Sequence, residues 1–230
     1  MDLKASIKVC MFDQYGTVVD MQAGLVEAAT PFLRAKGWQG NPNSFVTWWR
    51  RTHFENSMID SLLGREHTPY RVIGERAVAH VMDRSGIQHT PDEVHALVAH
   101  IERLRPFPEV PAALERLRTR YGLVVLSNGD PDMLETAQRY HGIAFDHVIS
   151  VAVANAFKPH HATYTRAAEI AGVAMDQVLF VANHEFDCVG AKAVGMRTAF
   201  INRRGRPFGA WPHQPDIVVP SMTELAKLLL

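Results

Sequence analysis

The chain has 230 residues, of which 47% are hydrophobic and 21% charged, an ordinary composition for a globular protein with a sizeable core. Lys plus Arg and Asp plus Glu number 24 each, which argues against a protein that binds nucleic acid or an anionic membrane surface. No run approaches the ~18 apolar residues of a membrane span and the N-terminus lacks a signal-peptide pattern, so we expect a soluble, cytoplasmic protein.

The first predicted element is a buried strand. Ile7 to Phe12 is a short apolar run, interrupted by Lys8, that stops at Asp13. Tyr15-Gly16-Thr17 follows as a turn. The pattern predicts a strand with a polar residue at its carboxyl end, where ligands of α/β proteins bind.

The next stretch, residues 20–103, shows no strand-like alternation and indicates several helices. Asn41-Pro42-Asn43-Ser44 and Thr90-Pro91-Asp92-Glu93 are helix-start signals. The predicted helices are Ala23–Lys36, Ser44–Leu63, Pro69–Ser85 and Pro91–Leu104. This stretch therefore predicts a helical module inserted after the first strand.

The remainder alternates between strands and helices. The predicted strands are Leu123–Leu126, Val178–Val181, Thr198–Ile201 and Ile217–Val219. The predicted helices are Val110–Arg120, Pro131–Tyr140, His161–Ala171 and Val189–Val194. Such alternation predicts an α/β fold with a Rossmann-like parallel sheet core. We assign residues 1–19 and 104–230 to this catalytic core, and residues 20–103 to an all-helical cap domain.

Four short motifs, in order along the chain, resemble those of the haloacid dehalogenase superfamily. Phe12 to Asp20 resembles the first motif, Ser127-Asn128-Gly129 the second, Lys158-Pro159 the third, and Asp187 followed by Gly190 the fourth. The match spans nearly the whole chain, and the helical insert lies where that family has its cap. The resemblance implies that Asp13 is a catalytic nucleophile.

Tyr15 indicates which chemistry the nucleophile performs. Phosphatases of this superfamily carry a second Asp two residues after the nucleophile, which protonates the leaving alkoxide. Tyr15 stands at that position and cannot do this well near neutral pH. A halide leaves as a stable anion and needs no proton. The chain therefore most resembles the L-2-haloacid dehalogenases (type II), including a branch associated with fluoroacetate-type substrates.

The resemblance implies the residues of the first step, in which Asp13 attacks C2 of a short 2-haloalkanoic acid and forms an aspartyl ester. Arg50, in Trp48-Trp49-Arg50-Arg51, would stabilise the departing halide, with Arg51 as the alternative register. Ser127 and nearby backbone amides would hold the substrate carboxylate. The expected substrate and halide pocket consists of Tyr15, Arg50, Ser127, Asn128 and Phe186.

The resemblance also supplies supporting residues. Lys158 would keep Asp13 ionised, and Thr17 would donate a hydrogen bond to its carboxylate or to the ester carbonyl. Tyr164 stands six residues after Lys158, as the family pattern has it. Asp187 is expected to orient or deprotonate the water that hydrolyses the ester, together with His184.

Two positions depart from the family pattern. Relatives often have Ser at the position of Ala182 and Asn at that of His184. His184 is open to two interpretations, a general base or a donor that narrows the halide pocket. The departure bears on substrate range more than on reaction class.

The remaining expectations concern cofactors and partners. We expect neither a metal nor another cofactor, because a metal on Asp13, the Tyr15 carbonyl and Asp187 would neutralise the nucleophile. The partner is a small halocarboxylate, with no nucleic acid and no membrane, and the resemblance allows a homodimer. The short basic segment Arg203-Arg204-Gly205-Arg206 is interpreted as a solvated loop. The alternatives are a Mg²⁺-dependent phosphatase of the same superfamily and a member without activity.

Overall fold

The computed structural model describes residues 3–64 and 66–230, and its backbone contacts divide the chain into two compact units. The first unit comprises the described residues of Met1–Val19 with Pro106–Asn128 and Ile143–Leu230. The second comprises those of Asp20–Arg105 with Gly129–Gly142. The grouping differs from the predicted domain boundaries in two respects: the helical unit extends to Arg105 rather than ending at residue 103, and residues 129–142 join it. The assignment of the units as core and cap stays a prediction.

The first unit is built on a six-stranded parallel sheet in the order β3-β2-β1-β4-β5-β6. Its strands are β1 (Val9–Phe12), β2 (Gly122–Ser127), β3 (His147–Ser150), β4 (Val178–Ala182), β5 (Arg197–Ile201) and β6 (Ile217–Val219). The predicted Rossmann-like α/β fold is thereby confirmed. Strand β3 was missed, because it is a short edge strand in which only Ile149 and Ser150 are buried.

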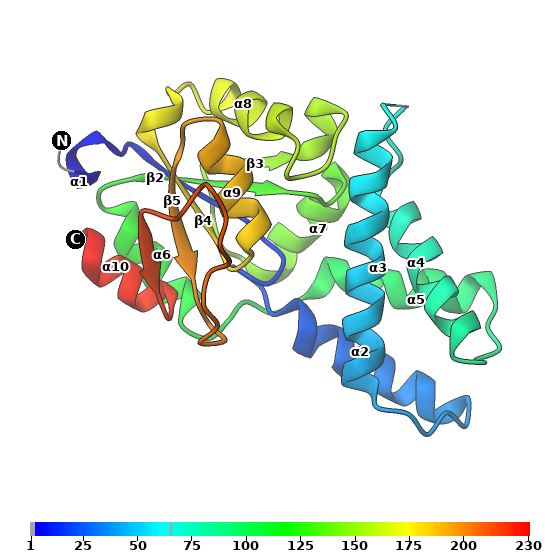
Figure 1. Cartoon of the computed structure of the whole chain (residues 1–230). Helices are drawn as coiled ribbons and strands as arrows, with labels where there is room; N and C mark the ends of the chain where they lie inside the picture. The colour runs from blue at the N-terminus through cyan, green and yellow to red at the C-terminus, as the bar shows by residue number, and fades with distance from the viewer. Residues whose placement is uncertain (1–2, 65) are drawn as a thin grey trace. The chain divides into compact units, whose positions relative to one another are not determined.

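The first unit also contains helices. They are α1 (Leu3–Ser6), α6 (Val110–Arg118), α8 (His161–Ile170), α9 (Glu185–Ala193) and α10 (Met222–Leu229), with the short 3₁₀ helices η2 (Val151–Ala154) and η3 (Met175–Gln177). Helix α6 packs against α10, and α8 packs against α9 (Figure 1). Helix α9 begins at Glu185 rather than at the predicted Val189, so its first turn lies directly after the end of β4.

The strand order places the carboxyl end of β1 at the centre of the first unit. From β1 the sheet grows through β2 to β3 on one side and through β4 to β6 on the other. A parallel sheet has its topological switch point where the direction of growth reverses, and ligands bind there. Phe12, the last residue of β1, is in register with Val125 and Val181 of the flanking strands. Asp13 therefore lies between the ends of β2 and β4.

The second unit is helical, as predicted for residues 20–103. It contains α2 (Met21–Ala35), α3 (Pro42–Leu62), α4 (Tyr70–Arg84), α5 (Pro91–Ala99), the 3₁₀ helix η1 (His100–Arg103) and α7 (Pro131–His141). Helix α7 is held in this unit by Asp130, whose carboxylate accepts the backbone N–H groups of Tyr70 and Arg71 at 2.8 and 3.0 Å. Arg71 in turn pairs with Glu102 and Asp132.

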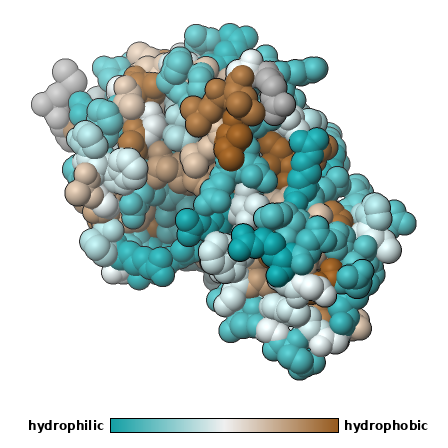
Figure 2. Space-filling view, turned by 45° about the vertical axis from the view of Figure 1, so that its right-hand side comes forward, coloured by the Kyte–Doolittle hydropathy of each residue, from teal (hydrophilic) through white to brown (hydrophobic). Residues whose placement is uncertain are grey.

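Apolar side chains are concentrated in the interior, and the surface is mostly polar. The visible face in Figure 2 is mainly hydrophilic, with separate hydrophobic patches. In the first unit, the apolar residues of β1, β2 and β4 are buried almost throughout. No helix among the described residues is long and apolar enough to cross a membrane.

Candidate active site

Asp13 is held at the end of β1 by a tight loop. Its backbone N–H continues the pairing with β4 by donating to the Val181 carbonyl at 3.0 Å. The chain then turns through Gly16, whose φ of +91° favours glycine. The loop returns Thr17 to Asp13, and the Thr17 hydroxyl donates to Asp13 Oδ2 at 2.7 Å. The same hydroxyl accepts the backbone N–H of Asn183 at 2.9 Å, which ties the loop to the end of β4.

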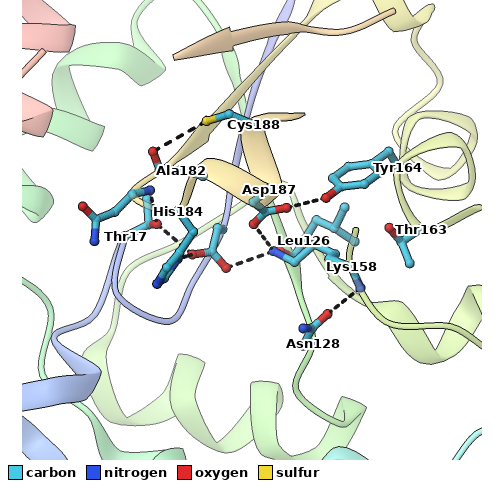
Figure 3. Close-up of polar contacts among 12 residues, drawn as sticks. Thr17, Leu126, Asn128, Lys158, Thr163, Tyr164, Ala182, His184, Asp187 and Cys188 are labelled. Atoms are coloured by element: carbon cyan, nitrogen blue, oxygen red, sulfur yellow. Dashed lines mark hydrogen bonds and ion pairs between the residues drawn. The ribbon is translucent and has the colours of Figure 1, made fainter. Parts of the chain in front are cut away.

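Lys158 joins the two buried carboxylates of the site (Figure 3). Its ammonium Nζ lies 2.9 Å from Asp13 Oδ1 and 2.7 Å from Asp187 Oδ2. The third donated bond goes to the Leu126 carbonyl at 3.0 Å. Because an ammonium has three N–H donors, all of them are used, and the side chain, 1% exposed, is fixed in place.

Asp187 is a fully enclosed carboxylate in the first turn of α9. Besides Lys158, it accepts the phenol of Tyr164 at 2.6 Å through Oδ1 (Figure 3). Tyr164 reaches it from α8 because Gly190 of α9 leaves room. A Cβ atom on Gly190 would lie only 2.7 Å from the phenol oxygen.

His184 brings an imidazole to the other carboxylate oxygen of Asp13. Its Nδ1 lies 3.4 Å from Asp13 Oδ2, and its side chain is 26% exposed. The residue is the N-cap of α9, but its side chain makes no capping bond. The ring of Phe186 lies beside it, with centroids 5.5 Å apart and the ring planes inclined by 32°.

The surroundings move the pKa values of the two carboxyl groups in opposite directions. Burial alone would raise the pKa of Asp13, but the charge of Lys158 and the proximity of His184 lower it well below its ordinary value. Burial raises the pKa of Asp187, and the charge of Asp13 adds to this against the opposing charge of Lys158. The pKa of Lys158 is raised: burial would lower it, but the two carboxylates outweigh that effect. Asp13 is therefore ionised at neutral pH.

Other residues expected in the pocket lie around this centre. Ser127 is buried at the end of β2, and Asn128 follows it half-buried. The amide oxygen of Asn128 accepts the backbone N–H of Lys158 at 3.0 Å, so its NH₂ group is directed away from that bond. Tyr15 is buried in the loop after Asp13.

Arg50 belongs to the second unit. It lies on α3, half-buried, and its Nη1 donates to Gln22 Oε1 at 2.9 Å. The alternative, Arg51, is exposed and pairs with Glu55 of its own helix at 2.7 Å. The surface pairing of Arg51 favours Arg50 for the halide role, which stays a prediction.

Two further residues were missed by the sequence interpretation. Arg203 is not simply part of a solvated loop: it lies 3.8 Å over the Phe107 ring, donates to the Thr17 carbonyl at 3.0 Å and pairs with Glu109. Gln14 follows Asp13 and is 1% exposed. Neither polar atom of its side-chain amide is hydrogen-bonded to a described residue. No sequence pattern marks either residue. Arg203 is distinguished by its contacts with residues distant in the chain, and Gln14 by its burial.

The carboxylates form a poor set of ligands for a divalent cation. Asp13 and Asp187 both bind the ammonium group of Lys158, a positive charge at the place where a cation would have to lie. Within residues 3–64 and 66–230, no group of three or more His, Cys, Asp or Glu side chains is arranged to hold a metal ion. We therefore derive no step through a metal.

Comparison with known proteins places this site in a family. The chain matches the haloacid dehalogenase-like hydrolases over residues 7–195. It is 30% identical to haloacetate dehalogenase H-2 of Moraxella sp. (strain B) over 226 residues, which are 97% of this chain and 98% of that protein.

Solved structures agree with the sequence match. An L-2-haloacid dehalogenase from Xanthobacter autotrophicus with chloropropionic acid covalently bound has a TM-score of 0.88 at 28% identity, covering 97% of this chain and 98% of that one. A defluorinating L-2-haloacid dehalogenase has a TM-score of 0.85 at 28% identity, covering 97% and 95% of the two chains. The sheet order, the Asp13 centre and these similarities lead to one conclusion: the chain belongs to the haloacid dehalogenase-like hydrolase family.

Proposed function

We propose that this protein hydrolyses short 2-haloalkanoic acids to 2-hydroxy acids, as an (S)-2-haloacid dehalogenase, through an ester on Asp13. The observation that carries the proposal is the state of Asp13. Its carboxylate is bound by Lys158 and Thr17, its pKa is lowered, and no carboxylic acid follows two residues later. A nucleophile without a neighbouring acid suits a leaving group that needs no proton.

In the first step, an oxygen of Asp13 attacks C2, a C–O bond forms, and the carbon–halogen bond breaks to release halide. Lys158 and Thr17 orient the carboxylate with bonds of 2.9 and 2.7 Å. Ser127 with nearby backbone amides holds the substrate carboxylate. Asn128 and Arg50 stabilise the departing halide as charge develops on it. Phe186 and Tyr15 complete the halide and substrate pocket.

In the second step, water attacks the carbonyl carbon of the Asp13 ester, and the C–O bond of the Asp13 carboxyl group to the substrate oxygen breaks. The substrate oxygen leaves as the 2-hydroxyl group, and Asp13 is restored. The relative with chloropropionic acid covalently bound supports a covalent route. The relatives named haloacetate dehalogenase and (S)-2-haloacid dehalogenase support the substrate class.

The direct test follows halide release from chloroacetate and fluoroacetate in the presence of EDTA. Release without metal supports the proposal, whereas hydrolysis of phosphate esters alone, and only with Mg²⁺, would indicate a phosphatase. A single turnover with excess enzyme in H₂¹⁸O should place ¹⁸O in the Asp13 carboxyl group, read by mass spectrometry of its peptide. Label in the hydroxy acid product alone would contradict the ester.

Asp13→Asn supplies the matching variant. Its carboxamide is a poor nucleophile but keeps the size of Asp13, so halide release should fall to background. Retention of the parent rate, with deamidation to Asp excluded by mass spectrometry, would remove Asp13 from the mechanism. A homodimer, which light scattering would detect, and a cytoplasmic location remain part of the proposal.

A further inference from the structure

We propose that His184 is the general base that activates water for hydrolysis of the Asp13 ester, in place of Asp187. The inference rests on the proposed function, because it concerns the second step of that reaction. It depends on a comparison of the two groups that lie near Asp13 and are able to accept a proton.

Asp187 has the basicity for this role but not the access. It is 0% exposed. One carboxylate oxygen accepts Tyr164 at 2.6 Å and the other accepts Lys158 at 2.7 Å. Each oxygen could accept a second hydrogen bond, but no part of the side chain is exposed, so water that reaches Asp13 has no open approach to it. Asp187 therefore acts as the anchor that positions Lys158.

His184 has both access and position. Its side chain is 26% exposed, and Nδ1 lies 3.4 Å from Asp13 Oδ2, on the opposite oxygen from Lys158. The ring makes no capping bond to α9, although an N-cap side chain normally binds the first turn. The imidazole thus lies beside the carboxylate of Asp13 and makes no bond to the first turn of its own helix.

Formation of the ester leaves the imidazole beside the group that water must attack. Alkylation removes the negative charge of Asp13, and the resulting ester lies next to His184 Nδ1, which is 3.4 Å from Asp13 Oδ2. His184 then accepts a proton from water as the water oxygen bonds to the carbonyl carbon of the ester. The protonated ring returns this proton to the departing 2-hydroxyl oxygen as the C–O bond breaks. The carboxyl proton of Asp13 passes to solvent, and the carboxylate is regenerated.

Substitution of His184 should slow ester hydrolysis but not ester formation, and the two steps can be measured separately. In His184→Asn and His184→Phe, a rapid-quench experiment should show about one equivalent of halide released per site at nearly the parental rate. Turnover should then slow by about 10²- to 10⁴-fold. Mass spectrometry of acid-quenched protein should show the Asp13 peptide as its ester, well above the level in the parent.

The choice of variants distinguishes catalysis from structure. Asparagine is a preferred N-cap residue, so His184→Asn should keep or raise the melting temperature while it loses turnover. His147→Asn, an exposed histidine on β3, is the matched control and should behave as the parent.

Two results would overturn the inference while leaving the proposed function intact. One is a folded His184→Asn protein with turnover within a few-fold of the parent and no excess ester. The other is loss of the initial halide release itself, which would place His184 in the first step. If the parent protein releases no halide from any haloacid, the proposed function fails instead.

Discussion

Replacing Lys158 by Met should both destabilise the protein and reduce its rate of halide release by more than tenfold. Lys158 is the single positive charge between Asp13 and Asp187, so the buried group changes from a net charge of −1 to −2. At an effective dielectric constant of ~20, each pair contributes roughly 6 kcal/mol of gross attraction at such distances. Most of that attraction offsets the cost of desolvation. Loss of one partner from a buried ion pair typically costs about 3–5 kcal/mol of unfolding free energy.

The pH dependence of this loss follows from the carboxylates. In the parent, the pKa of Asp13 lies below its unfolded value. Its ionised form therefore adds stability above about pH 4, which is lost as pH falls through the folded pKa. Without Lys158, burial would raise the pKa of Asp13. The deficit should then be largest near pH 7–8 and shrink toward pH 5, and the acid limb of halide release should move to higher pH.

Urea unfolding between pH 5 and 8 and stopped-flow halide release measure these effects. Lys227→Met is the matched control, because Lys227 pairs with Glu224 at the surface at 2.7 Å and should change stability by about 0–1 kcal/mol. If Lys158→Met loses no more stability than this control and retains halide release within tenfold of the parent, the assignment of Lys158 is refuted.

Three further substitutions test contacts around the site. Gly190→Ala should cost about 1–3 kcal/mol of unfolding free energy and slow turnover, because its methyl group would lie 2.7 Å from the Tyr164 phenol oxygen. The double variant Gly190→Ala/Tyr164→Phe should lose less unfolding free energy than the sum of the losses in the two single variants. If urea unfolding shows that the two losses simply add, the contact between these residues is contradicted. Arg203→Lys should slow halide release several-fold, because an ammonium cannot both stack as a planar guanidinium and bind the Thr17 carbonyl. The exposed neighbour, Arg204→Lys, is the control, and equal rates for the two variants would exclude a positioning role. Thr17→Val keeps the side-chain shape but removes the 2.7 Å bond to the nucleophile, so the halide burst should slow while the fold is retained; an unchanged burst would show that this bond is dispensable.

Much of the fold could be predicted from the local pattern. Short apolar runs identified five of the six strands. Four of them, β1, β2, β4 and β5, are buried almost throughout, and strands buried on both faces are largely apolar. The edge strand β3 was not predicted, because its apolar run is only Val148-Ile149, between the polar residues His147 and Ser150. The grouping of α7 with the helical unit depends on Asp130 and its bonds to the start of α4, sixty residues back in the chain. Periodicity carries no information about such a contact.

The sequence by itself determined which chemical groups are available: a carboxylate at the end of the first strand, a lysine, a second carboxylate, and Tyr15 where a phosphatase has its acid. These follow from residue identity and order. Only the tertiary structure decided how they are used. The strand order places Asp13 and Asp187 so that both carboxylates bind Lys158. It also buries Asp187 and leaves the side chain of His184 partly exposed beside Asp13. The physical reason is that access and hydrogen bonding, which separate an anchor from a base, arise between segments that are distant in the chain.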